Sequence, residues 1–156
     1  PEVISTGVHI CELTIEPSDG TIHLEDYCVV ADVGTIVNPI IVHGQLHGGV
    51  TQGIGQALLE DVAYDPENGQ TLTGSFLDYC LPRADDLPNF NISFNEVAET
   101  DNLIGAKGAG ESATSGAPAA VMNAVADALR HAGAEPVDMP ATSEKIWRTL
   151  RKAGVG

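Results

Sequence analysis

Residues 38–60, NPIIVHGQLHGGVTQGIGQALLE, predict a long helix around which the rest of the fold is arranged. Asn38 is a suitable N-cap residue, and Pro39 suits the first helical position, where a backbone N–H would have no helical partner. Apolar side chains follow at helical spacing: Leu46, Val50, Ile54, Ala57 and Leu58. This spacing predicts one buried face and an end near Glu60.

Glycines interrupt the interior of this helix. They are Gly44, Gly48, Gly49, Gly53 and Gly55, and at about 0.8–1 kcal/mol each relative to alanine they would cost roughly 4–5 kcal/mol together. One explanation is that glycines four apart let another backbone approach the helix. The other is that a bulky ligand lies against this face, near the amides of Gln45 and Gln52, which fall on one side of a helix. The spacing alone leaves both explanations open.

The preceding segments predict a β-hairpin. Residues 3–16 and 21–33 alternate between apolar and polar side chains, and the turn sequence PSDG at 17–20 separates them. A second pair of short strands is predicted on either side of the PENG turn at 66–69. Residues 90–97, FNISFNEV, alternate as a further strand.

The C-terminal third predicts two more helices. One starts near Pro118, carries Val121, Val125 and Leu129 at helical spacing, and stops at Gly133. The other follows Pro140 with Thr142 as its cap and carries Ile146, Trp147 and Leu150. Strands and helices do not alternate regularly, so the sequence predicts the α+β class: antiparallel hairpins with three helices in a single domain, residues 1–156.

The composition excludes several function classes. The net charge is −15, from 22 acidic and 7 basic residues, which disfavours nucleic acids and anionic membrane surfaces as partners. No apolar run approaches the roughly 18 residues of a membrane span, so we expect a soluble, cytoplasmic protein. The three cysteines lack metal-site spacing and are expected to be buried free thiols in a reducing compartment. Because residue 1 is not methionine, we expect a piece of a longer chain.

His43 and His47 are four residues apart, a spacing that can bind zinc on a helix. The metalloprotease pattern needs Glu directly after the first histidine, where this chain has Gly44, and no third ligand follows from any pattern. We therefore expect surface or capping roles for both rings and no metal ligands.

Residues 104–112, IGAKGAGES, place one carboxylate, Glu111, among glycines and small side chains. Gly108, Gly110 and Ala113 fit a dinucleotide-binding fingerprint, but Glu111 would repel a pyrophosphate and no clean strand precedes it. Lys107 is not followed by Ser or Thr, which excludes a P-loop. A solvated loop carboxylate and a general base in a tight apolar loop, where burial raises a carboxyl pKa, both remain open.

The runs VVADVGTIVNPIIVHGQLHGGVTQGIGQALLED, GSFLDYCLPRADDLP and GAKGAGESATSGAPAAVMNAVADAL together resemble a known family. They resemble the C-terminal part of the molybdenum-binding large subunit of the xanthine oxidase family, the molybdenum hydroxylases. The resemblance is strongest to the aldehyde, isoquinoline and carbon monoxide dehydrogenase types, and it covers nearly the whole chain in the same order.

The resemblance implies a role for each matched position. Glu111 would be the base that takes a proton from a molybdenum-bound hydroxyl, and Gln45 would contact the pterin. The other positions implied to contact the cofactor are Gln52, Gly44, Gly48, Gly49, Lys107, Gly108, Ala109, Gly110 and Ser112. Glycines would then allow a broad cofactor to approach the backbone, and the cofactor itself would supply the redox chemistry.

The resemblance also implies what must be added to this chain. The cofactor would be molybdopterin, with a cytosine dinucleotide as the expected form, and partner domains would carry iron-sulfur clusters and FAD. The remaining large-subunit segments would complete the site for an aldehyde or N-heterocycle substrate, so we expect the chain alone to be inactive. The alternative is a non-catalytic truncated domain that serves only in assembly or protein interaction.

Overall fold

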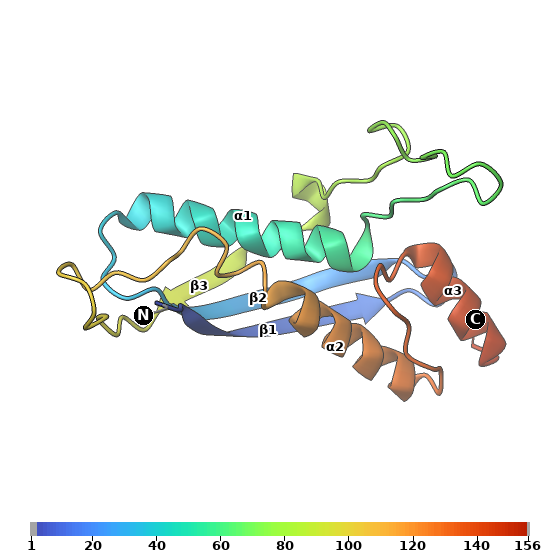
Figure 1. Cartoon of the computed structure of the whole chain (residues 1–156). Helices are drawn as coiled ribbons and strands as arrows, with labels where there is room; N and C mark the ends of the chain where they lie inside the picture. The colour runs from blue at the N-terminus through green and yellow to red at the C-terminus, as the bar shows by residue number, and fades with distance from the viewer. Residues whose placement is uncertain (1–2, 156) are drawn as a thin grey trace.

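The computed structural model describes residues 3–155 (Figure 1). Its elements are β1 (Thr6–Ile15), β2 (Ile22–Asp32), α1 (Pro39–Leu58), the short 3-10 helix η1 (Ala84–Asp86), β3 (Phe90–Phe94), α2 (Ala117–His131) and α3 (Ser143–Lys152). A small mixed sheet and three α-helices confirm the predicted α+β class.

The sheet has the order β1-β2-β3. β1 and β2 form the predicted antiparallel hairpin, with a register shift between Glu12 and Leu13. β3 runs parallel to β2, with Tyr27 opposite Phe90. A parallel neighbour requires a long crossover connection, and α1 lies in that connection. The expectation of antiparallel strands alone is therefore corrected at β3, which is also shorter than predicted.

The second predicted hairpin, around residues 64–73, is not formed by strands. Only an isolated bridge joins Tyr64 and Thr71, and the turn between them is closed by the bond from the Gly69 amide to the Asp65 carbonyl, 2.8 Å. This segment lies away from the sheet (Figure 1). A short two-stranded ribbon without a neighbouring surface has too little burial to stabilise a ladder, which explains the difference.

Both α1 and α2 cover the same face of the sheet. Tyr27 of β2 is fully buried on that face, and its hydroxyl lies 2.9 Å from Nδ1 of His9 on β1. The rings of His43 and His47 on α1 contact Phe94 and Phe90 of β3, respectively. The start of α2 packs on His9, because a Cβ on Gly116 would lie 2.7 Å from its ring.

The helix predictions are confirmed in their caps and buried faces. Asn38 Oδ1 accepts a bond from the Ile41 amide, and Thr142 Oγ1 accepts one from the Lys145 amide. The apolar residues predicted to face the core are buried: Leu46, Val50, Ile54, Ala57 and Leu58 on α1, Val121, Val125 and Leu129 on α2, and Ile146 and Leu150 on α3. Trp147, the other apolar position predicted on α3, remains partly exposed.

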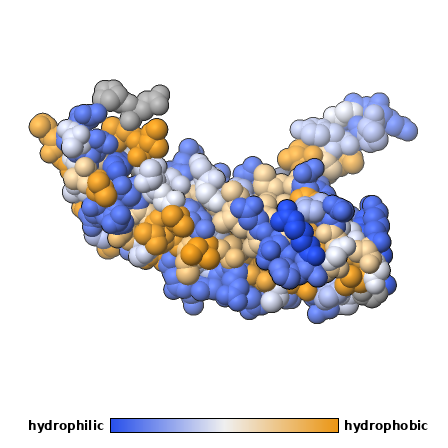
Figure 2. All heavy atoms as spheres, turned by 90° about the horizontal axis from the view of Figure 1, so that it is seen from below, coloured by the Kyte–Doolittle hydropathy of each residue, from blue (hydrophilic) through white to orange (hydrophobic). Residues whose placement is uncertain are grey.

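The opposite face of the sheet is open to solvent. Val8 and Ile10 of β1 and Val30 of β2 project from it, with Val8 directly opposite Val30. The space-filling view from below shows hydrophobic side chains gathered on the surface (Figure 2). The fold therefore has two layers, with one sheet face uncovered.

The cysteines are free, as predicted, but they are not all buried. Cys11 and Cys28 are partly buried, and burial raises the pKa of the Cys11 thiol to about 11. Cys80 is exposed, which corrects the expectation for this residue.

None of the helices within residues 3–155 has both the length and the apolar character needed to cross a bilayer.

Gly53→Ala is expected to lower the free energy of unfolding by about 1–3 kcal/mol, because overpacking forces neighbouring groups apart. The added Cβ would lie 2.6 Å from Cβ of Ala117 and 2.9 Å from Cδ of Pro118. Urea denaturation measures the change. Gly44→Ala is the matched control: no neighbouring group lies within 4 Å of its new Cβ, and alanine should raise helix stability by up to about 1 kcal/mol. Equal stability of the two variants would contradict this packing.

Candidate functional site

The glycines of α1 fall into two groups with different surroundings. Gly49, Gly53 and Gly55 are buried, and a Cβ on Gly49 would lie 3.1 Å from both Cβ of Ala113 and Oγ1 of Thr114. At Gly55 an added Cβ would meet Glu60 and Pro82. These glycines serve close packing, so Gly49 differs from the expectation that it faces a cofactor.

Gly44 and Gly48 instead face open space: apart from the backbone of α1 itself, no atom lies within 4 Å of a Cβ placed on either residue. Both are exposed, as are Gln45 and Gln52. Together these four residues form one side of α1, which we call the open stripe. A helix surface without Cβ atoms and with two amide side chains accepts a broad, polar-edged group at short distance from its backbone.

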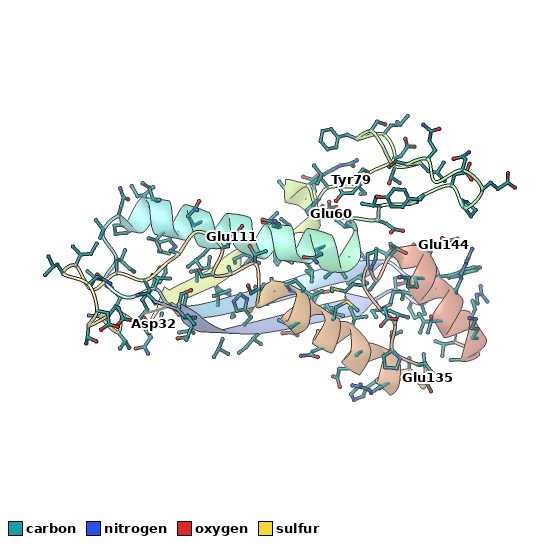
Figure 3. All side chains as sticks on the ribbon, in the orientation of Figure 1. Asp32, Glu60, Tyr79, Glu111, Glu135 and Glu144 are labelled. Atoms are coloured by element: carbon teal, nitrogen blue, oxygen red, sulfur yellow. The ribbon has the colours of Figure 1, made fainter. Side chains whose placement is uncertain are left out.

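The loop that carries Glu111 runs beside the open stripe. Nε2 of Gln45 donates to the carbonyl oxygen of Gly110 at 3.4 Å, which joins the helix to the loop directly before Glu111. The Glu111 carbonyl accepts a bond from the Thr114 amide at 3.1 Å, and Ser112 Oγ donates to the Ala109 carbonyl at 3.2 Å. Along the length of the molecule, Glu111 lies beside α1, between Asp32 at one end and Glu60 at the other (Figure 3).

The Glu111 side chain is exposed in the chain as it stands. Gly108 is exposed as well, with nothing within 4 Å of a Cβ placed on it. The structure places the loop and the glutamine helix side by side, although Gln45 and Gly110 are 65 residues apart in the chain. Within residues 3–155, however, no tight apolar enclosure surrounds the Glu111 carboxylate, because this side of the loop is open.

Lys107 does not reach toward the open stripe. Its Nζ lies 2.6 Å from Oδ2 of Asp32, and both side chains are nearly buried, at 11% and 12% exposure. Oδ1 of Asp32 accepts bonds from the amides of Gly34, at 2.9 Å, and Val97, at 3.2 Å. The Lys107 ammonium group and these amide donors hold the pKa of the Asp32 carboxyl below its usual value. The Lys107 side chain thus anchors the loop to the end of β2, and the residue also lines the groove between the loop and the start of α1.

Backbone contacts complete this anchor. The Lys107 amide donates to the Val33 carbonyl at 2.8 Å, and the Gly105 carbonyl accepts from the amides of Thr35 and Glu99 at 2.8 and 2.9 Å. Gly34 has a φ of +67°, and a Cβ on it would collide with the Gly105 carbonyl oxygen. Only glycine at position 34 lets the end of β2 and the loop lie this close.

Asp32 is the residue that sequence reasoning missed. The signal available was Asp32-Val33-Gly34 at the end of a strand, an acid followed by a glycine at the edge of the sheet. Its partner lies 75 positions later, a separation that no local pattern connects.

The two histidines of α1 have packing roles. Nδ1 of His47 lies 2.8 Å from the His43 carbonyl oxygen, and both rings lie against phenylalanines of β3. Within residues 3–155, no group of three or more His, Cys, Asp or Glu side chains is placed to hold a metal ion.

The arrangement fits a large group that brings its own metal ligands. A groove between the start of α1 and the loop is lined by residues that include Val37, Ile41 and Ala109. Ala109 directly precedes Gly110, the partner of Gln45, so the groove, the Gln45 amide and the Glu111 carboxylate lie along the same stretch of the loop. The donor set suits hydrogen bonding to an organic cofactor better than direct coordination of a metal.

The family model and the related proteins that match this chain agree on one family. Residues 1–88 match the family model of the molybdopterin cofactor-binding domain. The chain is 44% identical over 149 residues to the nicotine 6-hydroxylase large subunit of Paenarthrobacter nicotinovorans, covering 96% of this chain and 18% of that protein. It is 33% identical over 146 residues to the carbon monoxide dehydrogenase large chain of Hydrogenophaga pseudoflava, covering 94% and 18%.

Solved structures show the same fold. A Cu,Mo carbon monoxide dehydrogenase matches with a TM-score of 0.91 and 32% identity, over 96% of this chain and 19% of that one. Quinoline 2-oxidoreductase from Pseudomonas putida 86 matches with a TM-score of 0.85 and 41% identity, over 90% and 18%. The chain thus spans about a fifth of the length of the relatives it matches.

Asp32→Asn is expected to lower stability at neutral pH and to change its pH dependence. A carboxyl with a lowered folded-state pKa stabilises the fold above its unfolded pKa, about 3.9, and this contribution disappears as the pH falls through the folded value. The difference in unfolding free energy between wild type and variant should therefore be present at pH 7 and shrink toward pH 2. Urea denaturation across this range measures it.

Hydrogen exchange at the amides of Thr35, Glu99 and Lys107 should also accelerate in Asp32→Asn. Asp101→Asn, an exposed acid on the same loop, is the control and should change neither quantity. A constant difference between wild type and Asp32→Asn from pH 7 to pH 2 would count against the ion pair as the anchor.

Proposed function

Because the chain belongs to the molybdopterin cofactor-binding domain family, we propose that it supplies part of the cofactor pocket and the general base of a molybdenum hydroxylase. Its relatives are molybdenum-dependent oxidoreductases, and this chain corresponds to a fragment of their large subunits. In this proposal Glu111 is the base, and the open stripe together with the Gly108–Ser112 loop contacts the cofactor.

The observation that carries the proposal is the bond between Gln45 and Gly110. It joins the one helix side without Cβ atoms at Gly44 and Gly48 to the backbone next to Glu111. A packing role explains Gly49, Gly53 and Gly55, but it leaves Gly44 and Gly48 without a reason. A flat group lying on the open stripe gives them one, and Glu111 then stands at its edge.

The cofactor, when bound, supplies the redox chemistry. The residues of this chain supply position and proton transfer. Gln45 and Gln52 offer amide donors and acceptors to the polar edge of the pterin, and the glycines allow backbone contact. The Glu111 carboxylate would be positioned to accept a proton from a water-derived hydroxyl group at the edge of the bound cofactor. Lys107 and Asp32 keep the loop in place while this happens.

The remaining components follow from the same proposal. We take residues 1–156 as one C-terminal domain that assembles with the other large-subunit segments, which cover the exposed Glu111. Iron-sulfur and flavin subunits would carry electrons onward, and the pterin would carry a cytosine dinucleotide. The substrate would be an aldehyde or an N-heterocycle, and the acidic composition and free thiols suit a cytoplasmic complex.

Glu111→Gln should lower kcat/KM of the assembled enzyme by about 10²–10⁴-fold, the usual contribution of a general base. The test is co-expression with the rest of a large subunit, followed by measurement of bound molybdenum and of aldehyde or N-heterocycle oxidation. Molybdenum content should stay unchanged, because the variant keeps the shape of the side chain. Glu135→Gln, an exposed residue near the far end of the molecule, is the control (Figure 3). Full activity of Glu111→Gln would refute the base.

Gly48→Ala should separate stability from cofactor binding. Its Cβ would stand in open space, so the free energy of unfolding of the chain should rise by up to about 1 kcal/mol. The same Cβ would hold a flat cofactor away from the helix, and the molybdenum content of the assembled complex should fall. Asn123→Ala, on the exposed side of α2, is a control that should stabilise without loss of metal. Undiminished molybdenum in Gly48→Ala would favour the non-catalytic alternative or a different cofactor face.

A further inference from the structure

Residues 61–81 form an arm that projects from the C-terminal end of α1, away from the sheet (Figure 1). Within it, the Leu72 amide donates to the Ala63 carbonyl at 2.8 Å, and the Tyr79 amide donates to the Ser75 carbonyl at 2.8 Å. The arm therefore has local structure of its own, although it contains no strand or helix.

The base of the arm is fixed to the body. The Tyr79 hydroxyl donates to a carboxylate oxygen of Glu60, which raises the pKa of Tyr79. Pro82 packs so closely on Gly55 that a Cβ there would lie 2.7 Å from its Cγ. This anchoring sets where the arm leaves α1, so its outer residues are held out from the body.

The arm presents large apolar side chains to solvent. Phe76 is 83% exposed and Leu77 is 93% exposed. Four others are exposed by 43–60%: Val62, Tyr64, Leu72 and Leu81. An apolar group of this size on one short segment is typical of a surface that another protein covers.

The charge of the arm restricts the kind of protein surface that can cover it. Residues 61–81 contain four acids, Asp61, Asp65, Glu67 and Asp78, and no Lys, Arg or His. A second copy of this chain, with a net charge of −15, would repel them. Complementary charge therefore requires a partner surface with basic residues around an apolar centre.

The matched structures indicate where that surface lies. The carbon monoxide dehydrogenase match covers 96% of this chain, which leaves room for only about six unmatched residues of 156. Most of the arm is therefore matched in a chain of which this region is 19%. A path that leaves Phe76 and Leu77 exposed is one that contact with the rest of the longer chain would explain.

We propose that the arm docks Phe76 and Leu77 into an apolar pocket rimmed by basic residues on the remaining part of the large subunit. This inference rests on the proposed function, because it names the surface through which the chain joins that part. The aromatic ring and the leucine supply the buried area, and the acids around them set orientation and association rate.

The test uses the chain co-expressed with the remaining large-subunit part, with affinity capture of that part and quantification of the bound chain. Leu77→Ser should reduce the bound chain at least tenfold, and Leu103→Ser, an equally exposed leucine on a different loop, should not. Glu67→Lys should weaken capture in a salt-dependent manner, whereas Glu135→Lys should not; both glutamates are exposed. Circular dichroism of each free variant checks that the fold is retained.

Cys80 gives a second readout. Its exposed thiol lies next to Tyr79, and its alkylation rate should fall at least tenfold on assembly of the wild-type complex. If the complex forms and holds molybdenum but Leu77→Ser and Glu67→Lys bind like wild type, the docking assignment is overturned and the proposed function stands. If wild type neither associates nor supports molybdenum binding, both are overturned. Unchanged Cys80 reactivity in a formed complex also contradicts docking through the arm.

Discussion

The position of the candidate base depends on one carboxylate, Asp32. It stands where β2 ends and binds both the Lys107 ammonium group and two backbone amides, so it joins the strand to the loop that continues to Glu111. The charges attract strongly because both side chains are nearly buried, and the backbone bonds satisfy the second oxygen. A loop rich in glycine would otherwise sample many conformations, and a base in such a loop would seldom be aligned.

The glycine-rich helix satisfies two demands on opposite parts of its surface. At Gly49 and Gly53 the missing Cβ atoms bring the residue 113–118 segment against the helix, and this contact positions the loop from one side. At Gly44 and Gly48 the missing atoms leave the surface free. The intrinsic weakness of the helix is offset by packing in the first case only. The open stripe is therefore a feature that the fold of this chain alone does not explain.

Local patterns in the sequence were sufficient for the helices, their caps and the first hairpin. Asn38 and Thr142 accept bonds from amides three residues away, and Pro39 acts through its own fixed backbone geometry, which is why all three could be identified. The parallel pairing of β3, the division of the glycines and the turn of Lys107 toward Asp32 all depend on residues far apart in the chain. The resemblance supplied Gln45 and Glu111 as candidate site residues, and the structure adds the bond that brings their segments together.

The uncovered sheet face has a consequence for handling the chain by itself. This face carries an exposed hydrophobic patch, Val8, Ile10 and Val30, through which free molecules can associate. Electrostatic repulsion between molecules of net charge −15 opposes that association. Repulsion between exposed charges is screened within about 8–10 Å at physiological ionic strength and within about 3 Å at 1 M salt. Added salt thus removes the barrier while strengthening apolar attraction, so this acidic chain is most soluble in dilute buffer.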